Sequence, residues 1–531
     1  MKRTLCCILA AIMLTGLCGC AQKQVETKKL WVVTEVSCSD GMNYQAEMIA
    51  RRMEQANPGL TVELEILPTD PQEREARLTQ LRTKIMSGAG PDVYLLPTGG
   101  TLTTDYVNEY QHRVTQTTQV EPLFLDVVQA MRSGQFLDIS AYYESDDDLN
   151  TAALKREIMD AGTVHSRRYV LPLRFNIPVM FTDKALWERF GLSEALLESD
   201  GLTLSQTLME NAGDDNIVTG LGLPADLSLL SQPFDYGTET LQTTQQTIAD
   251  YMRLYQRWRA AAVPGEQALV DTAIEAYLSG LDELGLLVLE GPIGDMCQSI
   301  GVFNDLSQYI SVDVHWSTGG FPLYSCTMAE ALETLAVEKT YASIYGEERN
   351  LACYPFRDSA GCVTASVTYW GALGSGTKVP ELGYAFLRQF LEEEFQWDQY
   401  RPREDTQKKQ EIAEIQCHGQ VENSWPVRTV GSAAALWETL RYQNRDTVYS
   451  ERKESNQVGA AARALQFRDE EIPALSWNID EVRFPITITG TDSMESALSR
   501  LNMEDGTPTD ADIDELARQV YQGLWWHLAE G

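Results

Sequence analysis

An alternation of strand-like and helix-like segments in the first hundred residues most constrains the fold of this chain. Residues 30–36, LWVVTEV, are mostly apolar and β-branched, which predicts a buried strand. Met48, Ile49 and Met53 then recur at helical spacing, and residues 60–68, LTVELEILP, alternate as a second strand. A helix between two strands suggests that those strands run parallel.

A second unit of the same kind follows directly. The pattern of residues 74–86 predicts a helix with one apolar face. Residues 87–90, SGAG, end it, and Pro91 cannot continue it. Residues 92–96, DVYLL, then read as a third strand. The series of strand, helix, strand, helix and strand predicts an open, mostly parallel α/β sheet.

Such a sheet also indicates where a ligand would bind. In open α/β sheets, ligands bind beyond the carboxyl ends of the strands. The loops at residues 37–43 and 97–101 follow the first and third predicted strands. Asp40 and Asn43, in the first of these loops, are therefore candidate ligand contacts.

The amino terminus is typical of an export signal. Lys2 and Arg3 precede an apolar run at residues 5–17, which is shorter than the roughly 20 residues of a membrane span. The run ends in LCGC, which resembles a bacterial lipobox and implies cleavage before Cys20 and lipidation of Cys20. An ordinary secretory signal with an incidental cysteine is the alternative. We expect residues 21–29 to tether the protein to the outer face of a cell membrane.

Charge and cysteine content exclude other classes. The net charge of −35 disfavours nucleic acid as a partner, because it would repel phosphate backbones. Four of the ten cysteines lie at or before Cys20, which leaves six at irregular spacing. Cys353 and Cys362 bracket a short segment and are the first candidates for a disulfide, but whether they pair stays open. The chain has no CxxC motif for zinc, so we expect no metal site.

Catalytic motifs are also missing from the sequence. It contains neither HExxH nor a GxSxG nucleophile elbow. Residues 146–157 place acidic side chains at several EF-hand positions, but Thr151 stands where the turn needs glycine. Paired carboxylates for glycoside hydrolysis stay open, because sequence spacing does not give their separation in space. We expect a protein that is not an enzyme and has no cofactor.

Several blocks together resemble the extracellular solute-binding proteins of ABC importers, in particular the family that captures sugars and oligosaccharides. The helix, Gly-Ala-Gly turn and Pro-Asp-Val step at residues 81–97 are the first of them. The others follow in the same order as in that family: residues 136–192, GLLVLEGPIGD at 285–295, TYWGALGSGTKVPELGYAFLRQFL at 368–391, SWPVR at 424–428 and residues 507–530.

This resemblance implies a two-lobed periplasmic-binding-protein-like (flytrap) fold. Each lobe would contain a mostly parallel sheet flanked by helices, and three hinge crossings would join the lobes. The implied division is a signal peptide at 1–19, a lipidated cysteine and tether at 20–29, lobe 1 at 30–178 plus 286–366, and lobe 2 at 179–285 plus 367–531.

The function implied is capture of a sugar or oligosaccharide outside the cell and delivery to the permease subunits of an ABC transporter. Separate subunits would hydrolyse ATP, since this chain has no recognisable nucleotide site. A non-sugar solute such as a peptide or polyamine is an alternative, and the acidic composition suits a cation. A surface glycan-active lipoprotein enzyme and an adhesive lipoprotein are further alternatives.

Aromatic rings and polar anchors are the expected ligand contacts, because sugar rings stack on aromatics and their hydroxyls need hydrogen-bond partners. Position relative to the implied crossings, or to the ends of strands, selects the candidates. They are Trp370, Tyr369, Arg174, Phe175, Asp40, Asn43 and Glu290, with Tyr236, Trp316 and Trp425 as weaker candidates. Core packing is predicted instead for Trp187, Trp258, Trp525 and Trp526, which lie on helical patterns.

Overall fold

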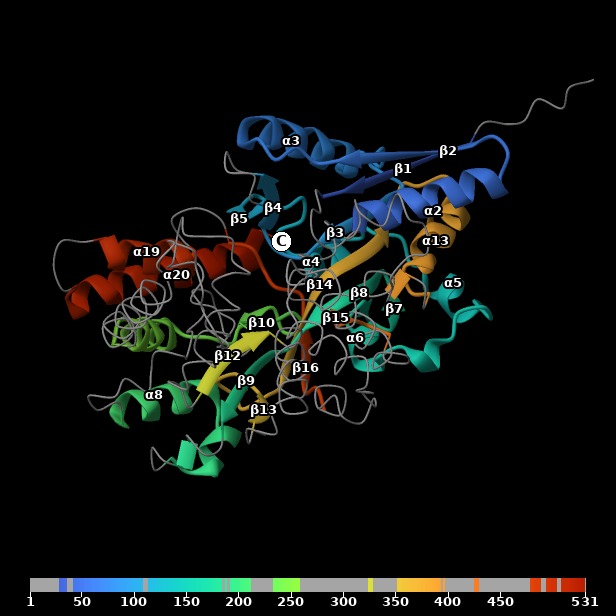
Figure 1. The fold of residues 1–531 in the computed structure, drawn as a ribbon. Coiled ribbons are helices and arrows are strands. Elements are labelled where there is room, and N and C mark those ends of the chain that lie inside the picture. Colours follow the sequence, from blue (N-terminus) through green and yellow to red (C-terminus); the bar gives the residue numbers. More distant parts are fainter. Residues whose placement is uncertain are drawn as a thin grey trace, which may run out of the picture.

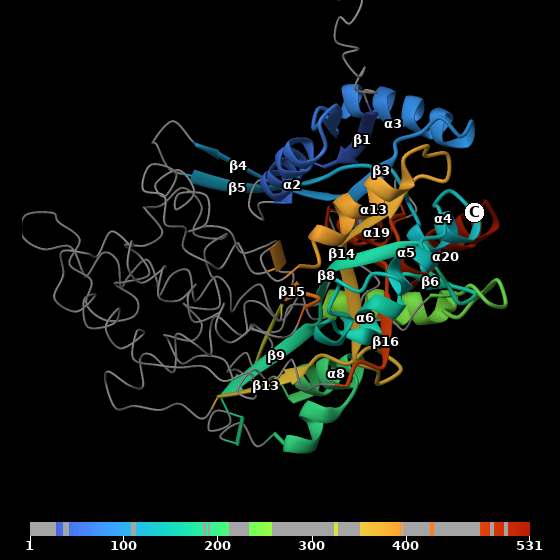
Figure 2. The same ribbon diagram turned by 90° about the vertical axis from the view of Figure 1, so that its right-hand side faces the viewer.

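The computed structural model shows a mixed α/β protein built around two separate buried clusters (Figure 1). We call them the first core and the second core. Helix α3 (Pro71–Met86) of the first core and helix α8 (Gly201–Asn211) of the second lie at opposite ends of the molecule in both ribbon views (Figure 2). The structure describes residues 28–35, 42–107, 113–183, 187–188, 192–211, 233–257, 323–327, 351–392, 395–396, 425–428, 478–488, 493–503 and 508–530.

A seven-stranded sheet forms the frame of the first core. Its order is β15-β8-β14-β3-β1-β2, and β16 pairs with β14 off this path. The strands are β1 (Lys28–Thr34), β2 (Leu60–Ile66), β3 (Val93–Pro97), β8 (Val170–Asn176), β14 (Thr364–Leu373), β15 (Trp425–Pro426) and β16 (Glu481–Arg483).

The predicted alternating series makes up the parallel part of this sheet. Strand β1 pairs in parallel with both β2 and β3. Strand β14 then continues the sheet antiparallel to β3 and β8, while β16 runs parallel to β14. The sheet is therefore mixed: a parallel strand–helix series is extended by antiparallel strands from distant parts of the chain.

The helix-to-strand junction at α3 and β3 forms as the sequence predicts. The side chain of Asp70 caps α3 by accepting from the backbone N–H groups of Gln72 and Glu73, at 3.0 Å each. Because Pro71 suits the first helical position, the helix begins three residues before the predicted Arg74. After the C-cap at Ser87, Gly88 adopts φ +70°, the left-handed conformation that glycine favours.

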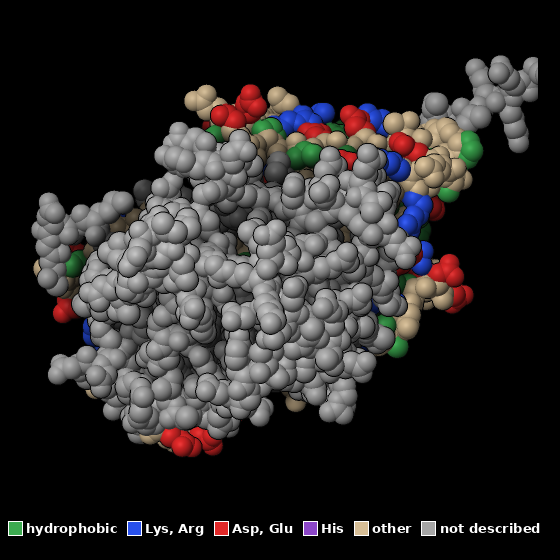
Figure 3. All heavy atoms as spheres, viewed as in Figure 1, with side chains coloured by type: hydrophobic (Ala, Val, Ile, Leu, Met, Phe, Trp, Pro, Cys, Tyr) green, Lys and Arg blue, Asp and Glu red, His purple; other side chains and the backbone are tan. Residues whose placement is uncertain are grey.

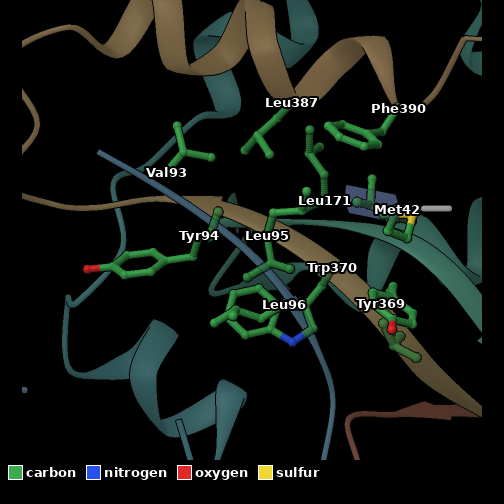
Figure 4. Packing of buried hydrophobic residues seen from close by; sticks show 14 of the residues in the cluster. Met42, Val93, Tyr94, Leu95, Leu96, Leu171, Tyr369, Trp370, Leu387 and Phe390 are labelled. Atoms are coloured by element: carbon green, nitrogen blue, oxygen red, sulfur yellow. The ribbon is translucent and has the colours of Figure 1, made fainter. Parts of the chain in front are cut away.

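Helices α2 (Met42–Ala56) and α13 (Pro380–Gln389) pack on the first core. A Cβ atom on Gly371 would lie 2.5 Å from the Cδ2 atom of Leu387, so α13 approaches β14 closely at this glycine. Strand residues alternate in direction, so Trp370 points to the opposite face. Figure 4 shows Leu387 and Phe390 on one side of the strands and Trp370 on the other.

The second core consists mainly of helices. It contains α8, residues 245–257, α19 (Met494–Met503) and α20 (Asp510–Glu530), which bury side chains against one another. A three-stranded antiparallel sheet of order β12-β9-β13 lies beside them. Its strands are β9 (Pro178–Asp183), β12 (Leu323–Thr327) and β13 (Leu351–Pro355).

Two tryptophans of α20 contradict the predicted core packing. The buried residues of this helix form a stripe at helical spacing that includes Val520 and Leu524. The next two residues lie off that stripe, so Trp525 is 49% exposed and Trp526 is 54% exposed. Trp187 is fully buried, which confirms that prediction, and Trp258 lies outside the described residues.

The chain passes between the two cores three times within the described residues. The first passage runs along β9, from Val179 in the first core to Trp187 in the second. The second runs from Phe356 in the second core to Val363 in the first. The third runs from Phe484 in the first core to Ile486, which packs against the second.

The packing after the second passage differs from the predicted division. Residues from 367 onward were assigned to lobe 2, but the second half of β14 pairs with β3 and β8. Tyr384, Phe386 and Leu387 of α13 are also buried in the first core. Strand β14 is held on both sides by first-core strands, so the segment that follows it stays in the same core. The boundaries at residues 19, 20 and 286 fall outside the described residues.

Shorter elements complete the described fold. The described residues also form three two-stranded hairpins and several short helices. The hairpins are β4 (Thr101–Val107) with β5 (Arg113–Gln119), β6 (Thr163–Val164) with β7 (Arg167–Arg168), and β10 (Phe234–Asp235) with β11 (Thr240–Leu241). The short helices are α4 (Val127–Arg132), α5 (Ser140–Glu144), η1 (Thr151–Ala153), α6 (Arg156–Asp160) and η2 (Glu194–Glu198).

The surface near α3 carries both signs of charge, with basic and acidic side chains interspersed (Figure 3). Arg77 of α3 pairs with Glu65 of β2 along this edge. In the part of the chain that the structure describes, no helix is both long and apolar enough to cross a membrane. Cys362 is a free cysteine, so the structure does not pair it with Cys353.

Candidate functional site

The carboxyl ends of the parallel strands β1 and β3 meet at one edge of the large sheet. Thr34, the last residue of β1, is almost fully buried, and its hydroxyl lies 3.3 Å from the side-chain oxygen of Asn43 near the start of α2. Asn43 thus lies at the predicted edge of the sheet and is anchored there by a strand residue. Asp40, the other candidate from this loop, lies outside the described residues.

A buried ion pair holds the end of β1. Glu35 is 3% exposed and Arg74 is 2% exposed, and both carboxylate oxygens of Glu35 accept from the Arg74 guanidinium, one at 2.9 Å. Arg74 also donates through Nε to the backbone oxygen of Glu121 at 2.7 Å. A paired and hydrogen-bonded arginine satisfies the buried carboxylate. Glu35 therefore has its charge neutralised within the protein.

Two threonines lie where β3 and β14 end their pairing. The backbone N–H of Thr98 donates to the backbone oxygen of Thr368 at 2.7 Å, one step beyond the Tyr369–Pro97 pair. Residues paired in this way point to the same face of a sheet. The buried hydroxyl oxygens of Thr98 and Thr368 have no hydrogen-bond partner in the described part of the chain. Two unsatisfied hydroxyl groups therefore face the same side.

Trp370 adds a third unsatisfied group on this face. It lies two residues after Thr368, so the two side chains share a side of β14. Its ring is 1% exposed, with centroids 5.8 Å from Phe124 and 5.5 Å from Phe136. Its indole N–H is buried and, among the described residues, has no acceptor. Since buried polar groups are normally satisfied, this N–H is a candidate hydrogen-bond donor to a ligand.

The other candidates from these strands lie elsewhere in the first core. Tyr369 and Arg174 are paired residues of β14 and β8, and each is at most 3% exposed. Arg174 lies beside the segment that follows α13, where its Nη2 donates to the backbone oxygen of Gln396 at 3.4 Å. Phe175 is 1% exposed and pairs with Trp425 of β15. Trp370 packs instead against Phe124 and Phe136.

Tyr236 lies in a different polar cluster, beside the second core. Its hydroxyl donates to Oδ2 of Asp126 at 2.7 Å. Burial raises the pKa of Tyr236 well above its usual value, and the negative charge of Asp126 raises it further. Tyr236 is thus a neutral hydrogen-bond donor, already occupied by Asp126.

Sequence reasoning found the loop at residues 97–101 but did not select Thr98 within it. The only indication for Thr368 in the sequence was its position in a predicted strand, just before two aromatic residues. Oδ2 of Asp126 lies 3.3 Å from Nε2 of His527. These two residues are distant in sequence, and no sequence pattern indicated that they would meet. The candidates Glu290 and Trp316 and the lipidation candidate Cys20 lie outside the described residues. Within those residues, no group of three or more His, Cys, Asp or Glu side chains is placed to hold a metal ion.

Comparisons with known proteins find solved structures that resemble this one, at low sequence identity and low TM-score. No family model matches the sequence, and no curated protein matches it. Among solved structures, one similar protein is an extracellular solute-binding protein family 1 from Alicyclobacillus acidocaldarius, at 13% identity and TM-score 0.42, with 95% of this chain and 99% of that chain covered.

Two further solved structures show the range of the matches. One is the galacto-N-biose-/lacto-N-biose I-binding protein of the ABC transporter from Bifidobacterium longum, at 12% identity and TM-score 0.44, covering 95% of this chain and 98% of that one. The other is a de novo designed cysteine esterase, at 13% identity and TM-score 0.46, covering 95% and 100%. Solute-binding and ABC substrate-binding proteins recur among the matches. Because these scores are low, the function proposed below rests on the chain's own residues.

Proposed function

We propose that this chain is the substrate-binding lipoprotein of an ABC transporter, which captures a sugar or oligosaccharide outside the cell and delivers it to a membrane permease. The order of sequence blocks described above supports the importer role. The lipobox-like LCGC before Ala21 supports an anchor at Cys20 on the extracellular face of the membrane. The tether at residues 21–29 would then hold the protein near its permease.

The division into two cores suits capture by closure. Three passages of chain join the cores, so each core can move as a rigid body while a few backbone positions rotate. A ligand that contacts both cores shifts the population toward the closed arrangement. Binding without bond cleavage is sufficient for this role, and we propose that the chain is not an enzyme.

The observation that carries the ligand class is the set of unsatisfied groups at the sheet edge. Thr98, Thr368 and the indole N–H of Trp370 are neutral hydrogen-bonding groups on one face. Neutral donors and acceptors suit the hydroxyl groups of a carbohydrate. A cationic ligand is less favoured than a sugar here, because the carboxylate of Glu35 is already paired with Arg74.

A thermal-shift screen of the chain starting at Ala21 tests this proposal. The panel contains mono- and oligosaccharides, amino acids, peptides and polyamines. A ligand at about 100 times its Kd stabilises the folded state by roughly 2.7 kcal/mol, a shift of a few degrees. A sugar hit with no product formed supports the proposal, and a hit confined to polyamines or peptides overturns the carbohydrate class.

Matched variants connect a hit to the sheet edge. Thr368→Val keeps the β-branched shape but removes the hydroxyl, so we expect a smaller shift with the same sugar. Thr61→Val, at an exposed position of β2, is the control and should leave the shift unchanged. Equal shifts in both variants would place the ligand elsewhere.

A further inference from the structure

The segment just before and within α4 contacts the second core at several points. The backbone oxygen of Leu125 accepts from the N–H of Thr487 at 3.0 Å, beside the third passage between the cores. At the other end of α4, Arg132 Nη2 lies 3.0 Å from Glu239 Oε1, in the turn between β10 and β11. These polar contacts join elements that belong to different cores.

Asp126 is the centre of this interface. It is 8% exposed, and its Oδ1 accepts from the N–H of Gln129, which caps α4. Its Oδ2 accepts from the hydroxyl of Tyr236 at 2.7 Å and lies 3.3 Å from Nε2 of His527 on α20. One carboxylate oxygen of the first core therefore faces two side chains that pack against the second.

The surroundings of His527 make its charge relevant to this contact. Asp126 faces its ring from α4, and the ring of Phe234 on β10 lies 5.7 Å away. Tyr236 stays neutral because its pKa is raised, and Arg132 is paired with Glu239. Asp235 of β10 accepts from the backbone N–H groups of Gly237 and Thr238. Asp126 is thus the carboxylate that a protonated His527 would meet.

We infer that Asp126, Tyr236 and His527 form a pH-sensitive contact that stabilises the arrangement of the two cores seen here. Histidine is the side chain whose ordinary pKa, about 6.5, lies in the physiological range. A protonated imidazole donates to a carboxylate in a charge-assisted hydrogen bond, which is stronger than a neutral one. The added stabilisation is present when His527 is protonated and absent when it is neutral, while the hydroxyl of Tyr236 donates to Asp126 in either state.

Hydrogen exchange of the ligand-free protein tests the inference and does not depend on which ligand is captured. The reporter is the N–H of Thr487, which bonds across the interface. After correction for the intrinsic exchange rate, we expect its protection to rise about fivefold from pH 8 to pH 5.5 in the native chain, from the difference between charged and neutral hydrogen bonds. His527→Gln should abolish this rise.

Two further variants test whether the rise in protection depends on the charge of Asp126 and on His527 in particular. Asp126→Asn removes the negative charge and should also abolish the pH-dependent rise, with circular dichroism confirming that each variant is folded. His165→Gln, in the exposed turn between β6 and β7, is the matched control and should keep it. An equal rise in folded His527→Gln and in the native chain, or no rise in the native chain, overturns the inference. Because no ligand is present, either result leaves the proposed function to its own test.

Discussion

Replacing Trp370 with phenylalanine should cost little stability, although the side chain is almost fully buried. The substitution keeps an aromatic ring beside Phe124 and Phe136 and removes an indole N–H that has no acceptor within the described residues. A buried donor without a partner costs roughly 1–3 kcal/mol. The smaller ring leaves a cavity whose cost is of similar size, on the order of 1–3 kcal/mol. The two effects oppose each other, so we expect a net change within about 1 kcal/mol.

Trp187 provides the matched control in the second core. It is also fully buried, but its Nε1 donates to the backbone oxygen of Ser193 at 3.1 Å. Trp187→Phe creates a comparable cavity and also leaves that oxygen without its donor. The two losses add, and we expect a cost of roughly 2–5 kcal/mol.

Urea-induced unfolding, followed by circular dichroism, compares the free energies of unfolding of the two variants with that of the native chain. With a sugar identified in the thermal-shift screen, Trp370→Phe should bind about fivefold more weakly through loss of one hydrogen bond. Trp187→Phe should bind normally. The reasoning fails if Trp370→Phe costs as much stability as Trp187→Phe. Trp370→Ala is a poor binding probe, because removal of a buried tryptophan costs roughly 3–5 kcal/mol.

Three other predictions concern the ion pair, the thiol and the anchor. Arg74→Met leaves the buried carboxylate of Glu35 unpaired and should cost about 3–5 kcal/mol in urea unfolding, whereas Arg51→Met, at an exposed pair, should cost about 0.5 kcal/mol or less. Cys362 should react with iodoacetamide without prior reduction, but slowly at pH 8 and faster as the pH rises past 9, because desolvation and the nearby Asp358 raise its pKa. Peptide mass spectrometry would detect the modified thiol. Cys20→Ala should release the protein from the membrane fraction, and a variant that stays there after a high-salt wash would refute the lipid anchor.

Local chemistry explains why the first hundred residues were predictable. The Asp70 cap, the proline after it and the glycine at φ +70° are short-range devices that act within a few residues of α3. The parallel pairing of β1 with β2 and β3 follows from the alternation of strands and helices. Each of these features is encoded by neighbours in the sequence, so no knowledge of distant contacts was needed.

Long-range pairing explains why the later boundaries were not predictable. The place of β14 depends on β3, more than 250 residues earlier, and on β8. The sequence at residues 368–391 predicts a strand, a turn and a helix, and this pattern would be the same in either core. Only the strands that flank it decide which core it joins. The same holds for the contact between Asp126 and His527, which are 401 residues apart.

The face of a strand on which a side chain lies decides which ligand it can contact. The spacing of residues along β14 therefore helps to choose candidate contacts, in addition to the sequence motifs. Consecutive residues of a regular strand point to opposite faces, although the pairing of β14 with β8 is irregular between Tyr369 and Trp370. The structure places Trp370 with Phe124 and Phe136, and it pairs Tyr369 with Arg174 of β8. Thr368 lies two positions before Trp370 on β14, and Thr98, just after β3, donates its backbone N–H to Thr368. Hydroxyl groups at this spacing, rather than the neighbouring aromatic ring, are therefore the groups to mutate first.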